Sequence, residues 1–329
     1  MGKNLPNTQW LWMALLTAAV VPSCDPGSRA ASRAHVAADV ADSMGATPTA
    51  VSIIRTRARP ELVENSAAAM SATQPGVFFT INDSGNEPVL FAMDTTGADR
   101  GAWPLRGARN VDWESAAIGP CGSGHGVADC VYVGDTGDNH ARHKTRSVYR
   151  VREPAANGRN DSLDVESLTY VYSDGPHDVE AMYVAANGDM FFITKRQSRT
   201  ARGSLRPALV FQITGDAWRA PGRATAQLVD SLPTIIPGSA LLRVVTDASL
   251  APDGRHLAVR TYSQVYIVAT DAVTGRIIHS VPPSVCNITS LGEAQGEGVT
   301  WATSAGRLVF TSEGHTEPIR IANCPLPRG

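Results

Sequence analysis

One pattern recurs five times along this chain of 329 residues. Each copy has an acidic residue, a short apolar strand, a turn, a second apolar strand with a polar tip, and a third strand. The acidic residues that head the copies are 50, 66, 67 and 50 residues apart: Glu64, Glu114, Glu180, Asp247 and Glu297. Each interval has room for four short strands, which is the content of one β-propeller blade. The repeat therefore predicts an all-β propeller, with five four-stranded blades.

The two ends of the repeat region indicate how such a ring closes. After the last repeat's third strand, P-I-R-I, only the residues from Ala322 onward remain, too few for a fourth strand. The β-branched run that begins at Ala50 has no partner nearby. We expect this N-terminal run to complete the fifth blade, which leaves no free sheet edge. A sixth, degenerate blade between Trp218 and Leu242 is the alternative, although we assign that region to the outer strand of the third blade and its loop.

Composition supports a β fold and limits the partners. Hydrophobic residues make up 43% of the chain and charged residues 18%, and 29 Gly and 21 Pro supply turns. This content fits a single large all-β domain, for which we expect residues 49–329 and a monomer. The formal net charge of −2 provides no overall field for nucleic acid or anionic lipid. We therefore expect no nucleic-acid partner, and membrane contact only through an N-terminal lipid.

The N-terminus has the pattern of an export signal. Lys3 precedes an apolar run from Trp10 to Val21, which is short for a membrane span and typical of a signal peptide over residues 1–23. The run ends V-P-S-C, and Cys24 after a small residue resembles a bacterial lipobox, in which the cysteine is lipidated. Residues 24–48 then form a flexible tether. The alternative is ordinary secretion with a spare Cys24, so we expect an envelope lipoprotein or a secreted protein.

The other four cysteines are consistent with export. Their positions predict two disulfides, Cys121–Cys130 and Cys286–Cys324. Neither pair has the C-x-x-C spacing of a zinc site or redox motif, which argues against metal binding by cysteine. Disulfides are the better interpretation in an oxidising compartment.

In a propeller, the residues that precede the innermost strands meet at one face, beside the central channel. Here these residues are the five carboxylates that head the repeats, and like charges that converge in a narrow channel repel one another. A divalent cation with oxygen ligands would offset this repulsion, and flexible coordination by several carboxylates favours Ca²⁺ over Mg²⁺. The alternative is that each carboxylate caps backbone amides or pairs with a basic residue such as Arg106 or Arg109.

The second strands end at the same face and surround the carboxylates with a second set of polar residues. Acids follow the first two repeats, at Asp83 and Asp135, whereas Lys195 and Arg196 follow the third. Acids on one arc and bases on another are typical of a site that holds a cation beside an anionic group. We name Asp83 or Asp135 as the group that activates water, and His177 as a further candidate general base. The alternative is that loop tips are polar in any propeller.

These motifs resemble calcium-activated nucleotidases of the apyrase type, which are five-bladed propellers with a central Ca²⁺. The similar segments cover about residues 50–321: N-D-S-G at Asn82, D-W-E-S-A at Asp112, the run from Val179 to Arg196, and G-E-G-V at Gly296. The resemblance implies that Glu64, Glu114, Glu180 and Glu297 surround the ion, while Asp83, Lys195 and Arg196 face substrate phosphates. Asp247 departs from the pattern, which has a small hydroxyl residue there. The chain more loosely resembles phytase-like and lactonase-like propellers, which keep the metal and change the substrate.

Other catalytic patterns fit poorly. The G-S-G-H-G at Gly122 lacks the G-x-S-x-G frame of a nucleophile elbow, and D-T-G at Asp135 lacks the second copy of an aspartic protease. Two functions remain. One is an exported Ca²⁺-dependent hydrolase of phosphorylated or other anionic small molecules. The other is a non-catalytic propeller that binds a protein or glycan and uses calcium for structure only.

Overall fold

The computed structural model describes residues 45–56, 59–122, 129–158, 161–220, 222–314 and 316–328. The predicted signal peptide, the predicted lipid anchor Cys24 and the tether up to residue 44 lie outside the described residues. Ser43–Gly329 form one compact unit. None of its described helices is long and apolar enough to cross a membrane.

The described chain is built from β-strands, with two short 3₁₀ helices, η1 (Gly215–Arg219) and η2 (Thr289–Leu291). The strands form antiparallel meanders in which the first strand is innermost. The first meander contains β2 (Ala69–Met70), β3 (Val77–Ile81), β4 (Val89–Asp94) and β5 (Asp99–Arg106), with β9 (Leu163–Asp164) beside β5. The second contains β6 (Trp113–Pro120), β7 (Asp129–Asp135), β8 (Arg146–Arg152) and β10 (Glu166–Tyr172).

The later meanders repeat this order. The third contains β11 (Val179–Val184), β12 (Met190–Thr194), β13 (Leu209–Ile213) and β14 (Ala224–Ser231). The fourth contains β15 (Val245–Leu250), β16 (His256–Thr261), β17 (Gln264–Ala269) and β18 (Ser284–Asn287). The fifth contains β19 (Gly296–Thr303), β20 (Arg307–Ser312), β21 (Ile319–Asn323) and the N-terminal strand β1 (Thr49–Ile54).

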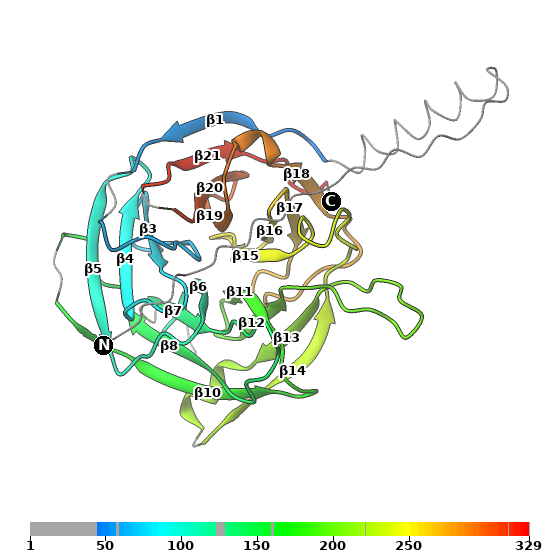
Figure 1. The fold of residues 1–329 in the computed structure, drawn as a ribbon, viewed down its shortest axis with the longest axis horizontal. Helices are drawn as coiled ribbons and strands as arrows, with labels where there is room; N and C mark the ends of the chain where they lie inside the picture. Colours follow the sequence, from blue (N-terminus) through cyan, green and yellow to red (C-terminus); the bar gives the residue numbers. More distant parts are fainter. Residues whose placement is uncertain are drawn as a thin grey trace, which may run out of the picture. The chain divides into compact units, whose positions relative to one another are not determined.

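The meanders stand around a common axis, as the ribbon in Figure 1 shows, and the prediction of an all-β propeller is confirmed. Closure by the N-terminal strand is also confirmed, because β1 pairs antiparallel with β21, with Ser52 opposite Ile321 and Ile54 opposite Ile319. The second and third meanders share one eight-stranded sheet, since β10 and β14 pair in parallel. Strand β14, from the region considered for a sixth blade, pairs with β13 as its outer neighbour.

The core follows from this arrangement, because each inner strand is covered on both faces. All five residues of β3, V-F-F-T-I, are buried, as are all five of β12, M-F-F-I-T. Buried clusters lie at each contact between consecutive meanders, and one joins the fifth meander to the first through Phe78, Phe91 and Val309. Stacked sheets that bury both faces explain why these strands read as continuous apolar runs.

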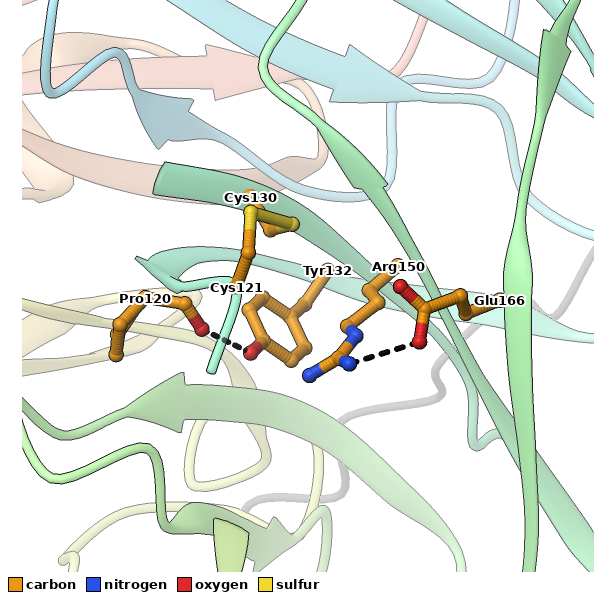
Figure 2. The surroundings of a disulfide bond; sticks show 6 residues. All are labelled: Pro120, Cys121, Cys130, Tyr132, Arg150 and Glu166. Atoms are coloured by element: carbon orange, nitrogen blue, oxygen red, sulfur yellow. Dashed lines mark hydrogen bonds and ion pairs between the residues drawn. A yellow bond between two sulfur atoms is a disulfide. The ribbon is translucent and has the colours of Figure 1, made fainter. Parts of the chain in front are cut away.

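Both predicted disulfides are present. Cys286–Cys324 joins β18 to the residue after β21. Cys121–Cys130 joins the end of β6 to β7, and Figure 2 shows it beside Tyr132, whose hydroxyl donates to the Pro120 carbonyl at 2.5 Å. Near it, Arg150 donates to Glu166 at 2.8 Å and lies 4.1 Å above the Trp218 ring. Two structural disulfides indicate a non-cytoplasmic protein.

Candidate cation site

Each innermost strand has a β-bulge near its start. In the second meander, Trp113 faces Asp135 and Ser115 faces Gly134, so that Glu114 is the extra residue. The register of the other innermost strands shifts at the same place. The residues at this equivalent position are Ser66, Glu114, Glu180, Thr246 and Glu297. A bulge re-aims its extra side chain, and Ser66 Oγ donates to Glu114 Oε2 at 2.8 Å, so neighbouring bulges are in contact.

Three of the five predicted metal ligands, Glu114, Glu180 and Glu297, therefore occupy equivalent positions, and Glu64 and Asp247 do not. Glu64 lies two residues before the bulge, is exposed, and accepts a hydrogen bond from Asn86 Nδ2 at 2.6 Å. Asp247 lies one residue after the bulge, fully buried. In a strand, a shift of one residue turns the side chain to the other face. The sequence pattern did not define the position of these acids to within one residue.

Asp247 caps backbone amides of its own strand and of two other meanders. Its carboxylate accepts from the amides of Ala248 and Val299 at 2.8 Å each, and from Ala68 at 3.3 Å. These bonds connect the fourth meander to the fifth and the first. Asp247 therefore fits the alternative drawn from the sequence, in which a carboxylate caps backbone amides. The small hydroxyl residue expected at this point of the repeat is its neighbour Thr246.

Three carboxylates form a compact cluster beside the start of β6 and the end of β3. One oxygen from each of Asp83, Asp112 and Glu114 lies within 4.8 Å of the others. Glu114 is buried, and Asp83 and Asp112 are half-buried, so the cluster is open to solvent on one side. Three oxygen ligands with one open side suit a hard divalent cation that keeps water or substrate oxygens as its remaining ligands.

Local contacts hold the two loops of this cluster together. Asn82 Oδ1 accepts from the amides of Val63 and Glu64 at 3.1 and 3.0 Å, which fixes the loop that carries Asp83. Asn110 Nδ2 donates to the Asp83 carbonyl at 2.7 Å and so joins this loop to the one that carries Asp112. The N-D-S-G motif thus combines one structural asparagine with one aspartate of the cluster.

The D-T-G-D turn after β7 forms the wall behind the cluster. The Asp112 amide donates to Asp135 Oδ1 at 2.9 Å, and Asp135 also pairs with the buried Arg146 at 3.4 Å. The amide of Gly137 donates to the Asp112 carbonyl at 3.1 Å. A Cβ at Gly137 would lie 2.6 Å from Glu114 Cγ and 2.7 Å from Asp112 Cγ, so the close approach requires glycine.

The carboxylates raise one another's pKa values in addition to the effect of burial. Burial raises the pKa of Asp112 to about 6, and the charge of Asp83 acts in the same direction. Burial, with the charges of Glu180 and Asp83, holds the pKa of Glu114 well above its usual range. Burial also raises the pKa of Glu313 to about 7, with the charges of Glu297 and Asp83 contributing. A bound cation would offset the repulsion between these carboxylates and favour their ionised forms.

The other side of the ring already has polar partners. Lys195 Nζ pairs with Glu180 Oε1 and donates to Asn139 Oδ1 at 3.4 Å. Burial raises the pKa of Glu180 to about 8, and the Lys195 ammonium opposes this shift. Tyr262 Oη donates to Glu297 Oε1 at 3.0 Å. Among the described residues, no basic side chain pairs with the carboxylates of the Asp83–Asp112–Glu114 cluster, and Glu114 accepts only from the Ser66 hydroxyl.

The predicted catalytic residues fall into three places. Asp83 belongs to the cluster, and Asp135 lies behind it as a support for Asp112. Lys195 is at the ring, and Arg196 is at its rim, where it pairs with Asp178 at 2.8 Å and stays largely exposed. His177 is apart from the carboxylates of the ring: it pairs with Asp174 at 2.8 Å and packs against Tyr172 and Phe211.

Sequence reasoning did not single out Asp112 and Glu313 as site residues. Asp112 lies within the D-W-E-S-A motif, two residues before Glu114, and this D-x-E spacing could have indicated it as a site residue. Glu313 follows β20 at the position equivalent to Asp83, because Ser312 faces Gly296 as Asn82 faces Asn65. The polar residues that follow the second strands were therefore the part of the sequence that indicated the site.

A large cavity lies elsewhere. It has a volume of about 590 Å³ and is lined by the far ends of the innermost strands, with small residues such as Ala69, Ala117 and Ala185. Its lining has no group of convergent acids or bases like that at the bulges. Because chemistry needs such groups, we place the candidate site at the carboxylate cluster and not in this cavity.

Comparison with protein-family profiles gives no match, and neither does comparison with curated protein sequences. Solved structures with similar shapes include the Malassezia sympodialis allergen Mala s 1, at 10% identity and a TM-score of 0.48, over 82% of this chain and 95% of that one. Myxococcus xanthus glutaminyl cyclase is similar at 13% identity and a TM-score of 0.45, over 83% and 95%. The PQQ-bound aldose sugar dehydrogenase of Streptomyces coelicolor is similar at 12% identity and a TM-score of 0.43, over 83% and 98%.

Proposed function

We propose that this propeller binds Ca²⁺ at the cluster of Asp83, Asp112 and Glu114. The observation that carries the proposal is the convergence of three carboxylate oxygens within 4.8 Å, among acids whose pKa values are raised. The donors are all oxygen, which suits a hard cation. Ser66 and Glu180 lie close enough to Glu114 to adjust its position or charge.

We further propose that the bound site hydrolyses a phosphorylated or similar anionic small molecule, as the nucleotidase resemblance implies. A bound divalent cation orients an anionic group and offsets its charge. Arg196, at the rim and largely exposed, is placed to pair with a second anionic oxygen. Lys195 would contribute its ammonium after leaving Glu180. Asp83 is the remaining candidate to accept a proton from water, because Asp135 is held by Arg146 and Asp112.

The proposed compartment is the cell envelope or the medium. The two disulfides support an oxidising environment. The signal peptide and lipidation at Cys24 rest on the sequence alone. Export would expose the site to millimolar calcium, the range in which extracellular modules bind the ion.

A second function is favoured by one observation. Lys195, Arg196 and His177 each already pair with a carboxylate, respectively Glu180, Asp178 and Asp174. A site whose bases are all engaged is consistent with a structural cation in a propeller that binds a protein or glycan. In that case the cation stabilises the loops that contact the partner, and no reaction takes place.

Thermal unfolding with calcium and with a chelator tests the cation. Calcium should raise the melting temperature of the wild type, and Glu114→Gln should abolish the rise. Glu61→Gln, an exposed change outside the cluster, is the matched control and should respond as the wild type does. A wild-type protein whose melting temperature does not respond to calcium would exclude the cation site.

Phosphate release separates the two functions. The wild type and Glu114→Gln are incubated with nucleotides, sugar phosphates and phytate in the presence of calcium. The hydrolase requires release by the wild type and at least about a hundredfold less by Glu114→Gln. Calcium binding without release from any of these substrates would favour the non-catalytic propeller.

A further inference from the structure

Two connections of the third meander form a surface of arginine and aliphatic side chains, here called the arginine–leucine surface. One connection, residues 196–206, follows β12 and carries Arg196, Arg199, Arg202 and Arg206. The other, residues 232–243, joins β14 to β15 and carries Arg243 together with Ile235, Leu241 and Leu242. Neither connection contains an aspartate or a glutamate.

Hydrogen bonds hold the two connections side by side. Gln197 Nε2 donates to the Ile236 carbonyl at 3.0 Å, and the Ile236 amide donates back to Gln197 Oε1 at 3.1 Å. At their base, the Val245 amide donates to the Lys195 carbonyl at 2.9 Å. The connection after β12 extends away from the sheets (Figure 1). The two loops thus present one surface, on the face that carries the candidate cation site.

The positive charge of this surface is largely unpaired. Among the described residues, no carboxylate pairs with Arg199, Arg202, Arg206 or Arg243, and only Arg196 has such a partner. Arg199 and Arg243 donate to carbonyls of their own loops, Gly203 and Gly238. The whole-chain net charge of −2 does not reveal this local excess of positive charge.

Aliphatic side chains stand out from the same surface. Leu241 is 67% exposed, Leu242 43% and Ile235 40%, whereas their neighbour Ile236 is fully buried and anchors the loop. Exposed apolar groups of this kind on a monomer mark an interaction site. Gly238 and Ser239 precede the exposed leucines in the chain, and neither connection contains an aromatic residue. The unpaired arginines beside these aliphatic side chains complement a surface that is both anionic and apolar, as an anionic lipid bilayer is.

We propose that the arginine–leucine surface binds an anionic lipid bilayer. Ile235, Leu241 and Leu242 insert at the boundary between headgroups and acyl chains, and the arginines pair with lipid phosphates. The inference revises the expectation that membrane contact involves only an N-terminal lipid. It is independent of the cation site, although binding in this way would turn the mouth of that site toward the bilayer.

A local probe tests this contact without interference from the N-terminus. The full chain carries Cys24→Ser and Leu241→Cys, so that the new cysteine is the one outside the two disulfides, and an environment-sensitive fluorophore is attached to it. Vesicles of phosphatidylcholine with phosphatidylglycerol should shift its emission to the blue and increase it. Vesicles of phosphatidylcholine alone should not. The same fluorophore at Leu228→Cys, an exposed position on β14, is the control and should not respond.

Charge variants complete the test. Arg202→Gln with Arg206→Gln, in the Leu241→Cys background, should weaken partitioning to the anionic vesicles about thirtyfold, since each basic residue near such a surface contributes about 1 kcal/mol. No response of the Leu241 probe to anionic vesicles, or an equal response to neutral ones, would overturn the proposal. A response to an acidic polypeptide but not to vesicles would also overturn it and indicate an acidic protein partner.

Discussion

Lys195 and Glu180 form an ion pair at the ring of carboxylates, with the lysine side chain 13% exposed and the glutamate 3%. The ammonium thus neutralises one of the three glutamates at the bulges, whereas no basic side chain among the described residues pairs with the Asp83–Asp112–Glu114 cluster. A positive charge so near the cluster competes with any bound cation, because the field of Glu114 also acts on Lys195.

The first prediction concerns this competition. Lys195→Met should increase the affinity for Ca²⁺ about tenfold, since a positive charge near the ion is removed and 1.4 kcal/mol corresponds to a factor of ten. Arg196→Met removes the same charge from a side chain that is 57% exposed, and water screens it, so the affinity should change little. Isothermal titration with calcium measures both. Equal effects of the two variants would contradict a local role for Lys195.

The second prediction is a loss of stability with rising pH in calcium-free buffer. The folded-state pKa values of Asp112, Glu313 and Glu180 are raised to about 6, 7 and 8, above those of the unfolded chain near 4. The folded protein therefore binds more protons, so its stability is highest at low pH within this range and falls as pH rises toward 8.

Thermal melts at a series of pH values measure this loss. The melting temperature should fall between pH 5 and pH 8, since each kcal/mol of lost stability lowers it by about 2–4 °C in a domain of this size. Saturating calcium at pH 8 should restore it, because the cation favours the ionised carboxylates. Stability that rises from pH 5 to pH 8 without calcium would contradict these pKa shifts.

The third prediction contrasts two ion pairs of different burial. Asp135→Asn leaves Arg146 buried without its charge partner and should lower the free energy of unfolding by about 3 kcal/mol. It should also weaken calcium binding, because Asp135 positions the backbone of Asp112. Glu166→Gln breaks the pair with Arg150 at a glutamate that is 62% exposed and should cost less than about 1 kcal/mol. Urea unfolding compares the two.

The fourth prediction ranks the disulfides. Cys286–Cys324 closes a loop with a separation of 38 residues and Cys121–Cys130 one of 9. Chain entropy assigns about 4 kcal/mol to the longer loop and about 2.5 kcal/mol to the shorter. Urea unfolding of Cys286→Ser with Cys324→Ser should therefore show the larger loss. If replacing Cys121 and Cys130 has the larger effect, loop entropy does not determine the order.

The fold could be predicted from sequence because its signals are local and repeated. Apolar runs such as V-F-F-T-I and M-F-F-I-T mark strands that are covered on both faces, and the unpaired run at Ala50 indicated the closing strand. Cysteine number and spacing also led to the two pairs that the structure contains. Each of these signals depends on neighbours in the chain or on simple counting.

The candidate site was less accessible from sequence because it depends on registers that differ by one residue. Glu64 and Asp247 fit the acidic pattern, but the bulges place Ser66 and Thr246 at the positions equivalent to Glu114. Asp112 joins Asp83 only because Asn110 links two loops from different meanders. The arginine–leucine surface likewise depends on contacts between segments more than thirty residues apart, as in the Gln197–Ile236 pair.

The pairing of β1 with β21 also determines the order in which the domain is completed. Thr49 lies opposite Asn323, so the first strand to be synthesised gains its partner only when almost the whole chain is present. Until then β1 has no partner strand, and an unpaired strand of this kind promotes association between chains. The slowest and most vulnerable stage of folding is therefore expected at the seam where the two ends of the domain meet.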